Sequence, residues 1–316
     1  MIVLLGGTGY IGRQFAAALE AQGWPFIAPA RSEVNYTRFG ELRDFLARIK
    51  PEFLINAAGY TGKPNVDACE QNQADTMQGN ALFPGMVAHV CAAMSLPWGH
   101  VSSGCIYSGA KVDAQGRSRV ERDLAQPPMA FLLRQNRAAF HGFTEEDEPN
   151  FSFRRLPCSF YSGSKALGEE AIQGCGQNYI WRLRIPFDEY DNPRNYLTKL
   201  QTYPKVYDNA NSLSHRADFV TACLELWRRR APYGIYNVTN PGFVTSRFVV
   251  EMIQKILRPR RAFEFFASDE EFYRAAARTP RSNCILDVSK LLATGVPMRP
   301  VEDALMDALR QWRPHS

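Results

Sequence analysis

The stretch Gly6-Gly7-Thr8-Gly9-Tyr10-Ile11-Gly12 follows the short apolar run 2–5 and precedes a helical pattern at residues 13–22. Glycines at this spacing permit a tight turn in which backbone N–H groups approach a pyrophosphate at the helix N-terminus. A plain strand–helix turn would also accept them, but the flanking strand and helix favour a dinucleotide-binding loop. The expected cofactor contacts of this loop are Gly6, Thr8, Gly9, Tyr10, Ile11 and Gly12.

The second predicted strand, residues 26–30, ends at Arg31-Ser32 rather than at an acidic residue. An Asp or Glu there would bind the adenosine ribose hydroxyls of NAD, whereas an arginine can pair with a 2′-phosphate. We therefore expect NADPH in preference to NAD, with Arg31 as a cofactor contact. The alternative for Arg31 is a solvated surface side chain.

Predicted strands and helices alternate along the first 185 residues. Strands are expected at 2–5, 26–30, 53–56, 98–103 and 179–184, and helices at 13–22, 39–50, 73–95 and 162–173. This alternation is typical of parallel βαβ units, so we expect an α/β fold with a Rossmann-type doubly wound parallel sheet.

The pattern loosens elsewhere. Residues 108–160 look loop-rich and 188–214 irregular, while a strand at 234–238 can rejoin the sheet. Helices are expected at 217–229, 245–257, 269–277 and 301–312. We assign residues 1–185, joined again by 215–240, to the NADP-binding domain, and 186–214 and 241–316 to a smaller C-terminal substrate lobe.

Composition excludes several classes of protein. With 316 residues, 45% hydrophobic and 22% charged, the chain is an ordinary globular protein rather than a disordered one. No apolar run reaches the ~18 residues of a membrane helix, and no signal peptide is expected. The seven cysteines form no C-x-x-C pair, so we expect free thiols, no metal site and a cytoplasmic location. The net charge of +5 includes one dense basic run, 228–230, at a predicted helix end, so we expect no nucleic-acid partner.

Two Tyr-x-x-x-Lys pairs occur, Tyr107 with Lys111 and Tyr161 with Lys165. On a helix this spacing places both side chains on one face, where the ammonium would lower the pKa of the phenol. The tyrosine can then deliver a proton to an alkoxide formed by hydride transfer. Only the second pair continues as an amphipathic helix, so we expect it to be catalytic and Tyr107 to lie in a loop or pocket wall.

Ser103 ends the fourth predicted strand, and ligands bind beyond the carboxyl ends of strands in open α/β sheets. Its hydroxyl can hydrogen-bond a substrate carbonyl and stabilise the charge that develops there. Ser102 is the neighbouring candidate, but strand alternation directs it to the other face.

These residues resemble the extended short-chain dehydrogenase/reductase family, and most closely its nucleotide-rhamnose synthases (4-keto-6-deoxyhexose 3,5-epimerase/4-reductases). The dTDP-4-dehydrorhamnose reductases are more distant in this resemblance. The matching stretches are 56–59, 61–67 with 69–70, 104–106, 143–147 with 149–150, 161–162, 192–195 with 198–199, 239–242 and 280–283.

The resemblance implies a reductase triad of Ser103, Tyr161 and Lys165, and an epimerising acid/base pair of Cys105 and Lys199. A ketone at C4 acidifies the hydrogens on C3 and C5, and inversion needs two proton-transfer groups, for which a thiol and an amine are suitable. The alternatives are a small buried cysteine, and a lysine that is solvated or contacts a diphosphate. The cofactor contacts implied beyond the glycine loop are Asn56, Ala57, Ala58, Gly59, Tyr161 and Lys165.

For the nucleotide diphosphate or ribose of a nucleotide-sugar substrate we favour Arg281, because arginine suits bidentate phosphate contacts. Further candidates are Arg194, Asn195 and Lys63, and each of the four can instead form a surface salt bridge. Residues 108–141 are longer than in the plant-like pattern, which is compatible with a lid or an oligomer contact, and a homodimer is possible.

The expected function is an NADPH-dependent 4-ketoreductase with 3- and/or 5-epimerase activity on a dTDP- or UDP-4-keto-6-deoxyhexose. Alternatives are an epimerase-only or reductase-only enzyme on another nucleotide sugar, such as a GDP sugar, and a non-catalytic NADP-binding regulatory subunit. The sequence fixes neither the nucleotide nor the stereochemistry of the sugar.

Overall fold

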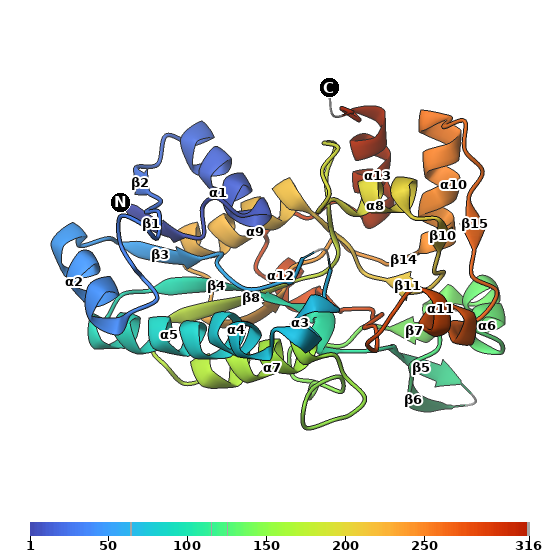
Figure 1. The fold of residues 1–316 in the computed structure, drawn as a ribbon, viewed down its shortest axis with the longest axis horizontal. Coiled ribbons are helices and arrows are strands. Elements are labelled where there is room, and N and C mark those ends of the chain that lie inside the picture. Colours follow the sequence, from blue (N-terminus) through green and yellow to red (C-terminus); the bar gives the residue numbers. More distant parts are fainter. Residues whose placement is uncertain (64, 115, 125, 315–316) are drawn as a thin grey trace.

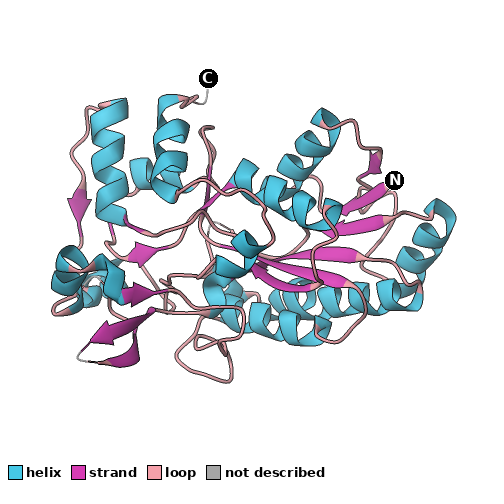
Figure 2. Ribbon diagram, turned by 180° about the vertical axis from the view of Figure 1, so that it is seen from behind, coloured by secondary structure: helices cyan, strands magenta, loops and turns pink. Residues whose placement is uncertain are grey.

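The computed structural model describes residues 1–63, 65–114, 116–124 and 126–314. A six-stranded parallel sheet forms the centre of the first lobe (Figures 1 and 2). Its strand order is β13-β8-β4-β3-β1-β2. The strands are β1 (Ile2–Leu5), β2 (Phe26–Ile27), β3 (Phe53–Asn56), β4 (Trp98–Ser103), β8 (Asn178–Leu183) and β13 (Gly234–Asn237). The doubly wound Rossmann-type α/β fold is confirmed, and the strand expected at 234–238 rejoins the sheet at its edge.

The chain winds outward in opposite directions from β1 and β3, which places the switch point of the sheet between them. Ligands bind at the carboxyl ends of the strands at such a point. Gly6 adopts φ +77°, and a Cβ atom there would lie 2.6 Å from the backbone nitrogen of Ala58. A Cβ at Gly12 would collide with the carbonyl oxygen of Gly6. Glycine is therefore required where the loop after β1 meets the loop after β3.

Helices cover both faces of the sheet (Figure 1). On one face, α1 (Tyr10–Ala21) and α9 (Arg216–Arg228) pack through Phe15, Leu19 and Phe219 against sheet side chains such as Phe53 and Trp181. On the other, α2 (Phe39–Ile49), α5 (Phe83–Ala93) and α7 (Phe160–Ile172) enclose a second apolar cluster. This burial on both faces explains why β1 and most of β3 are apolar.

The long helix predicted at 73–95 is divided into α4 (Gln73–Met77), a π-helical turn (Gln78–Leu82) and α5. Pro84 stands at the start of α5 and has no N–H group to donate into the preceding turn. The short helix α3 (Ala68–Gln71) precedes α4.

The second lobe packs around α8 (Tyr196–Thr202), α10 (Ser246–Leu257) and α13 (Val301–Arg310). Its two-stranded sheets are β9 (Pro186–Phe187) with β12 (Ser214–His215), β10 (Lys205–Val206) with β15 (Glu264–Phe265), and β11 (Ala210–Asn211) with β14 (Val244–Thr245). The expectation of an irregular segment at 188–214 missed α8. The helix expected at 269–277 is α11 (Asp269–Ala275).

Residues 108–141 are less loop-like than expected. They form a three-stranded antiparallel sheet of β5 (Ala110–Ala114), β6 (Arg117–Glu121) and β7 (Phe140–His141). The helix α6 (Met129–Gln135) lies between β6 and β7 in the chain. Val112 and Phe140 pack with Phe243 and Ile285 of the second lobe. The insertion thus joins the second lobe, whereas α12 (Ser289–Ala293) packs through Leu291 on the Rossmann sheet.

Among the described residues, no helix is both long and apolar enough to cross a membrane.

Candidate active site

The carboxyl end of β4 and the first turns of α7 bring together Ser103, Tyr161 and Lys165. The hydroxyls of Ser103 and Tyr161 lie within hydrogen-bonding reach of each other. Lys165 is buried, and its Nζ donates to the carbonyl oxygen of Val101 at 3.4 Å. The side chain of Ser159 caps α7 by accepting from the Ser162 backbone N–H at 3.1 Å, which fixes the start of the helix.

The pKa of Tyr161 differs from the sequence expectation. Burial raises it above the ordinary phenol value, the Cys105 and Cys69 thiols raise it further, and the Ser103 hydroxyl opposes the rise. The lowering expected from Lys165 is not among the main effects on this phenol. Burial lowers the pKa of Lys165. Tyr161 is therefore a neutral phenol at neutral pH, ready to donate a proton.

The competing pair has a different role. Tyr107 is fully buried, and its hydroxyl donates to the Asp147 carbonyl oxygen at 2.6 Å. The Lys111 ammonium pairs with the Asp147 carboxylate at 2.7 Å. Both residues thus hold the loop around Asp147. Ser102 points to the opposite face from Ser103, as expected, and donates to Glu169 Oε1 at 2.5 Å.

Cys105 lies in the 3₁₀ turn Gly104–Ile106 directly after β4, and its backbone N–H donates to Ser103 Oγ at 3.2 Å. Burial raises the pKa of its thiol, whereas hydrogen bonds from Ser103 and Ser162 and the charges of Arg184 and Lys165 lower it. Arg184, which follows β8, is absent from the sequence-based candidates. Its proximity to Cys105 arises from the pairing of β8 with β4, which no local motif reveals.

The second lobe contributes a cationic group through α8. Lys199 is half-buried, and burial together with the charge of Arg194 lowers the pKa of its amine. Among the described residues, the Lys199 side chain has no hydrogen-bond or ion-pair partner. Arg194 donates to Thr61 Oγ1 at 2.7 Å and to the Gly62 carbonyl oxygen at 3.3 Å. The start of α8 therefore lies against the loop that follows β3.

Arg281 lies at the same junction. Its guanidinium forms a bidentate pair with Asp67, with both N–O distances 2.7 Å. Two of its five N–H donors are used there, which fixes the plane of the guanidinium. Lys63, four residues before Asp67, is exposed.

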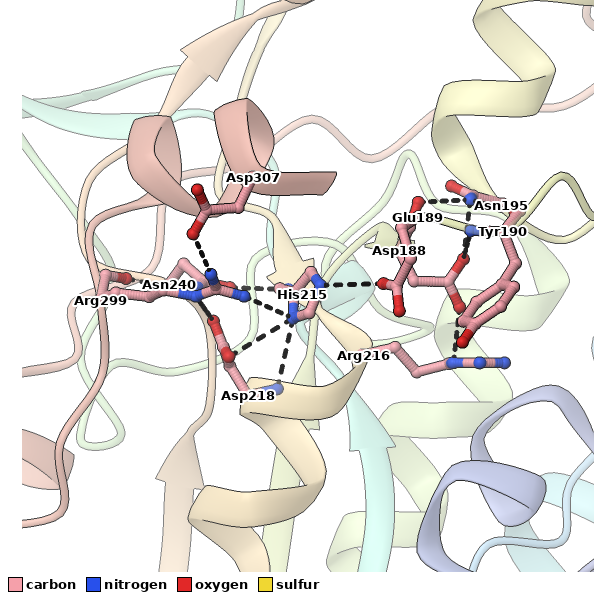
Figure 3. Close-up of polar contacts among 10 residues, drawn as sticks. All are labelled: Asp188, Glu189, Tyr190, Asn195, His215, Arg216, Asp218, Asn240, Arg299 and Asp307. Carbon is pink, nitrogen blue, oxygen red and sulfur yellow. Dashed lines mark hydrogen bonds and ion pairs between the residues drawn. The ribbon is translucent and has the colours of Figure 1, made fainter. Parts of the chain in front are cut away.

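Asn195 is fully buried and stabilises the start of α8 (Figure 3). Its side-chain oxygen caps the helix by accepting from the Leu197 N–H at 3.0 Å, and its amide donates to Asp188 Oδ1 at 2.8 Å. Asp188 also pairs with Arg216 at 2.7 Å, and the Arg216 guanidinium lies 4.5 Å from the ring of Tyr10. This network connects the glycine loop with α8 and leaves the Asn195 amide committed to the protein.

The loops after β1 and β3 have features that suit a dinucleotide. Helix α1 begins at Tyr10 after Gly9, with no acidic residue in its first turn, so its free N–H groups can donate hydrogen bonds to a phosphate. Asn56 is buried, and its Oδ1 accepts from the Ala58 N–H at 3.1 Å, which shapes the turn through Ala57 and Ala58. Gly59 comes next, where a Cβ would lie 3.3 Å from Lys165 Nζ.

In the loop after β2, Arg31 is exposed, and its guanidinium carbon lies 5.7 Å from the ring centre of Tyr36. No ion pair involves Arg31 among the described residues. Its charge is therefore available to a ligand.

Comparison with known proteins identifies the family. Residues 1–313 match the family described as the RmlD substrate binding domain. The bifunctional dTDP-4-dehydrorhamnose 3,5-epimerase/dTDP-4-dehydrorhamnose reductase of Arabidopsis thaliana is 31% identical over 312 residues, which cover 96% of this chain and 90% of the plant protein.

A trifunctional Arabidopsis protein, UDP-glucose 4,6-dehydratase/UDP-4-keto-6-deoxy-D-glucose 3,5-epimerase/UDP-4-keto-L-rhamnose-reductase, is 31% identical over 306 residues, or 96% of this chain. The chain spans only 41% of the length of that relative. Among solved structures, the L780 UDP-rhamnose synthase of Acanthamoeba polyphaga mimivirus has the same fold, with a TM-score of 0.81, 21% identity and 98% of both chains covered. The chain thus belongs to the RmlD substrate binding domain family and is an NAD(P)-dependent reductase of that family.

Proposed function

We propose that the protein is an NADPH-dependent nucleotide-sugar 4-ketoreductase that acts on a dTDP- or UDP-4-keto-6-deoxyhexose and epimerises it at C3 and/or C5 before reduction. The observation that carries the proposal is the convergence of Ser103, Tyr161 and Lys165 at the carboxyl edge of the sheet, beside the glycine loop. The activities in the names of the Arabidopsis and mimivirus relatives support the rhamnose-type sugar.

In the proposed reduction, NADPH, when bound, would supply the hydride that reduces C4 of the sugar. The Ser103 hydroxyl donates to the ketone oxygen and stabilises its growing negative charge. Tyr161, kept neutral by burial, gives its proton to that oxygen. Lys165 binds the nicotinamide ribose and offsets the charge left on the phenolate.

In the proposed epimerisation, Cys105 and Lys199 act from opposite faces of the sugar ring. One removes the proton from the carbon next to the ketone, and the electron pair of the broken C–H bond enters an enolate. Ser103 and Tyr161 stabilise the enolate oxygen. The other group then returns a proton to the opposite face. The lowered pKa of Lys199 supports this role, because an amine that titrates nearer to neutral pH transfers protons more readily.

Arg281 and Arg194 are proposed to bind the diphosphate, with Lys63 as an outer contact. Asp67 holds the Arg281 guanidinium in one plane and leaves three of its N–H donors for phosphate oxygens. Arg31 is proposed to contact the 2′-phosphate of NADPH, which supports the preference over NAD. Asn195 is left out of this set because its amide is buried and bonded within the protein.

The first test is the Tyr161→Phe variant. We expect it to bind NADPH normally, as measured by fluorescence titration, and to lose ~10²-fold or more in turnover with candidate 4-keto sugars. Tyr233→Phe, at a partly exposed phenol of the opposite sheet edge, is the matched control. Normal turnover in Tyr161→Phe would remove this residue from the mechanism.

The second test separates epimerisation from reduction. In D₂O, the wild-type protein should incorporate deuterium at C3 or C5 of the 4-keto sugar, and Cys105→Ser should not, while it still reduces a substrate that has already been epimerised. If the wild-type protein reduces the sugar without any deuterium uptake, the epimerase part of the proposal is wrong and the reductase part stands.

A further inference from the structure

Three lysine and arginine side chains are buried among the described residues, and they differ in how their charge is compensated. These are Lys165, Arg182 and Arg184. Arg182 forms an ion pair with Glu169 at 2.7 Å, and its Nε donates two further hydrogen bonds to the same carboxylate. Neither Lys165 nor Arg184 has a carboxylate within ion-pairing distance in the part of the chain that the structure describes. Lys165 belongs to the proposed reductase triad, so Arg184 is the buried cation that remains without a role.

Neutral groups hold Arg184 in place. Its Nη2 donates to Asn211 Oδ1 at 2.6 Å and also to the carbonyl oxygen of Ser282, and its backbone N–H donates to Ser214 Oγ at 3.0 Å. Its Nε is buried and has no hydrogen-bond partner among the described residues. The guanidinium is therefore fixed in position while its charge stays uncancelled.

A buried, unpaired cation is costly, because removal of a guanidinium from water must be compensated by an anion or by strong hydrogen bonds. A protein retains such a group where an anion forms during function. Arg184 directly follows β8, and Leu183 of β8 is paired with Ser103 of β4, so the charge lies next to the start of the Cys105 turn. Its field reaches Cys105 and Tyr161.

We propose that Arg184 is a positioning residue that provides the fixed positive charge for the thiolate of Cys105. This inference rests on the proposed epimerase role of Cys105. In each cycle the thiol gives up or takes a proton, so the site must accommodate a buried thiolate. Arg184 stabilises that anion through space without bonding to it, and its neutral anchors Asn211 and Ser282 keep the charge available.

Other titratable groups also face Cys105, and the test must separate them from Arg184. Lys165 and Tyr161 face it from α7, Cys69 from α3, Cys158 from the loop before α7, and Cys284 from the strand-like segment after Arg281. Lys165 is the only other cation in this set. Because it belongs to the triad, it stays unchanged in every variant below.

The experiment measures thiolate formation directly. The full-length protein is treated with iodoacetamide at a series of pH values, and alkylation of the Cys105 peptide is quantified by mass spectrometry. Cys175, a partly exposed cysteine on the other side of the molecule, serves as the internal reference. In Arg184→Gln we expect the pH midpoint for Cys105 to rise by about one pH unit or more, the effect of losing a nearby opposite charge. Arg184→Lys retains the charge and should stay close to wild type.

A second variant keeps the test valid if Arg184→Gln does not fold. Asn211→Asp leaves the guanidinium in place but gives it a carboxylate partner, so it should raise the Cys105 midpoint in the same direction. If neither Arg184→Gln nor Asn211→Asp changes the midpoint, the inference about Arg184 is wrong. A general loss of structure would move the Cys175 midpoint as well.

The two experiments distinguish failure of the Arg184 inference from failure of the proposed epimerase function. If Cys105→Ser still incorporates deuterium while Arg184→Gln shifts the thiol midpoint, the epimerase proposal fails and the electrostatic pairing stands. If Cys105→Ser abolishes incorporation while the midpoint does not move, Cys105 is catalytic and Arg184 does not assist it.

Discussion

Replacement of Asp218 by asparagine should destabilise the protein in a way that depends on pH. Asp218 accepts from Asn240 Nδ2 at 2.7 Å and from Arg299 Nε at 2.8 Å, and it lies 3.4 Å from His215 Nδ1 (Figure 3). Burial raises the pKa of this carboxyl, but the bonds from His215, Arg299 and Asn240 outweigh it and lower the pKa from 3.8 to about 2. By linkage this fall corresponds to about 2 kcal/mol of stability at neutral pH.

The sign follows from the direction of the shift. A carboxyl whose pKa is lower in the folded state stabilises the protein above its unfolded pKa of 3.8, and the contribution disappears as the pH falls through about 2. Asp218→Asn should therefore cost about 2 kcal/mol at pH 7 and much less at pH 2, as measured by urea unfolding at both values. Asp303→Asn, at an exposed position on α13, is the control and should change little. An equal loss at pH 7 and pH 2 would refute the charge argument and point to packing.

The contribution of His215 to stability should depend on pH in the opposite direction to that of Asp218. Burial lowers the pKa of its imidazole, but the bonds to Asp218 and Glu189 raise it above the ordinary 6.5 overall. Its stabilising contribution is present below pH 6.5 and is lost as the pH rises through the higher folded value. The Asp218 comparison at pH 7 and pH 2 should therefore be repeated at pH 5, where His215 is charged in both states.

Three further outcomes are expected. Gly12→Ala should abolish NADPH binding in a fluorescence titration, because the new Cβ collides with the Gly6 carbonyl oxygen and displaces the loop from the helix. Arg281→Lys should raise the KM for the nucleotide sugar by roughly 10-fold or more, with little change in kcat. Lysine cannot form the planar pair with Asp67, and the loss of one charged hydrogen bond to the substrate accounts for a change of this size. Glu169→Gln should lower the free energy of unfolding in urea by about 3–5 kcal/mol, because a buried guanidinium loses its counter-charge.

The strands of the sheet were largely predictable from the sequence. The predictions at 2–5, 53–56 and 98–103 agree with β1, β3 and β4 residue for residue. β1 and most of β3 are short apolar runs, and burial on both faces of the sheet favours that composition. The edge strand β2 stops at Ile27 instead of residue 30, because only β1 pairs with it and nothing continues the ladder beyond that point.

The second lobe was less predictable, for a physical reason. Helix α8 occupies a stretch rich in Asn, Tyr and Pro whose local propensity is weak. Its start depends on Asn195, whose side chain caps the helix and bonds to Asp188. The strand β6 was missed because it is exposed along most of its length. The alternation of β5, with Ala110 and Val112 buried, is too short to stand out from the sequence.

In the candidate site, the residues in local motifs were predictable from the sequence, whereas contacts between distant residues were not. The Tyr161 and Lys165 pair and Ser103 lie in motifs that the sequence displays. The ion pair of Arg281 with Asp67 joins residues 214 positions apart, and only the fold brings them together. The pKa of Tyr161 also depends on burial, which a four-residue spacing does not encode.

The position of the catalytic helix depends on both lobes. The Glu70 carboxylate oxygen Oε1 accepts from the Phe160 backbone N–H at 2.8 Å and from the Thr279 hydroxyl at 2.7 Å. One acceptor therefore connects the first residue of α7 to the segment that carries Arg281. Because Tyr161 is the next residue of α7, any displacement of that segment by a bound diphosphate would be transmitted to the phenol. Under the proposed function, Glu70 therefore holds the start of α7, and with it Tyr161, against the segment that would bind the diphosphate.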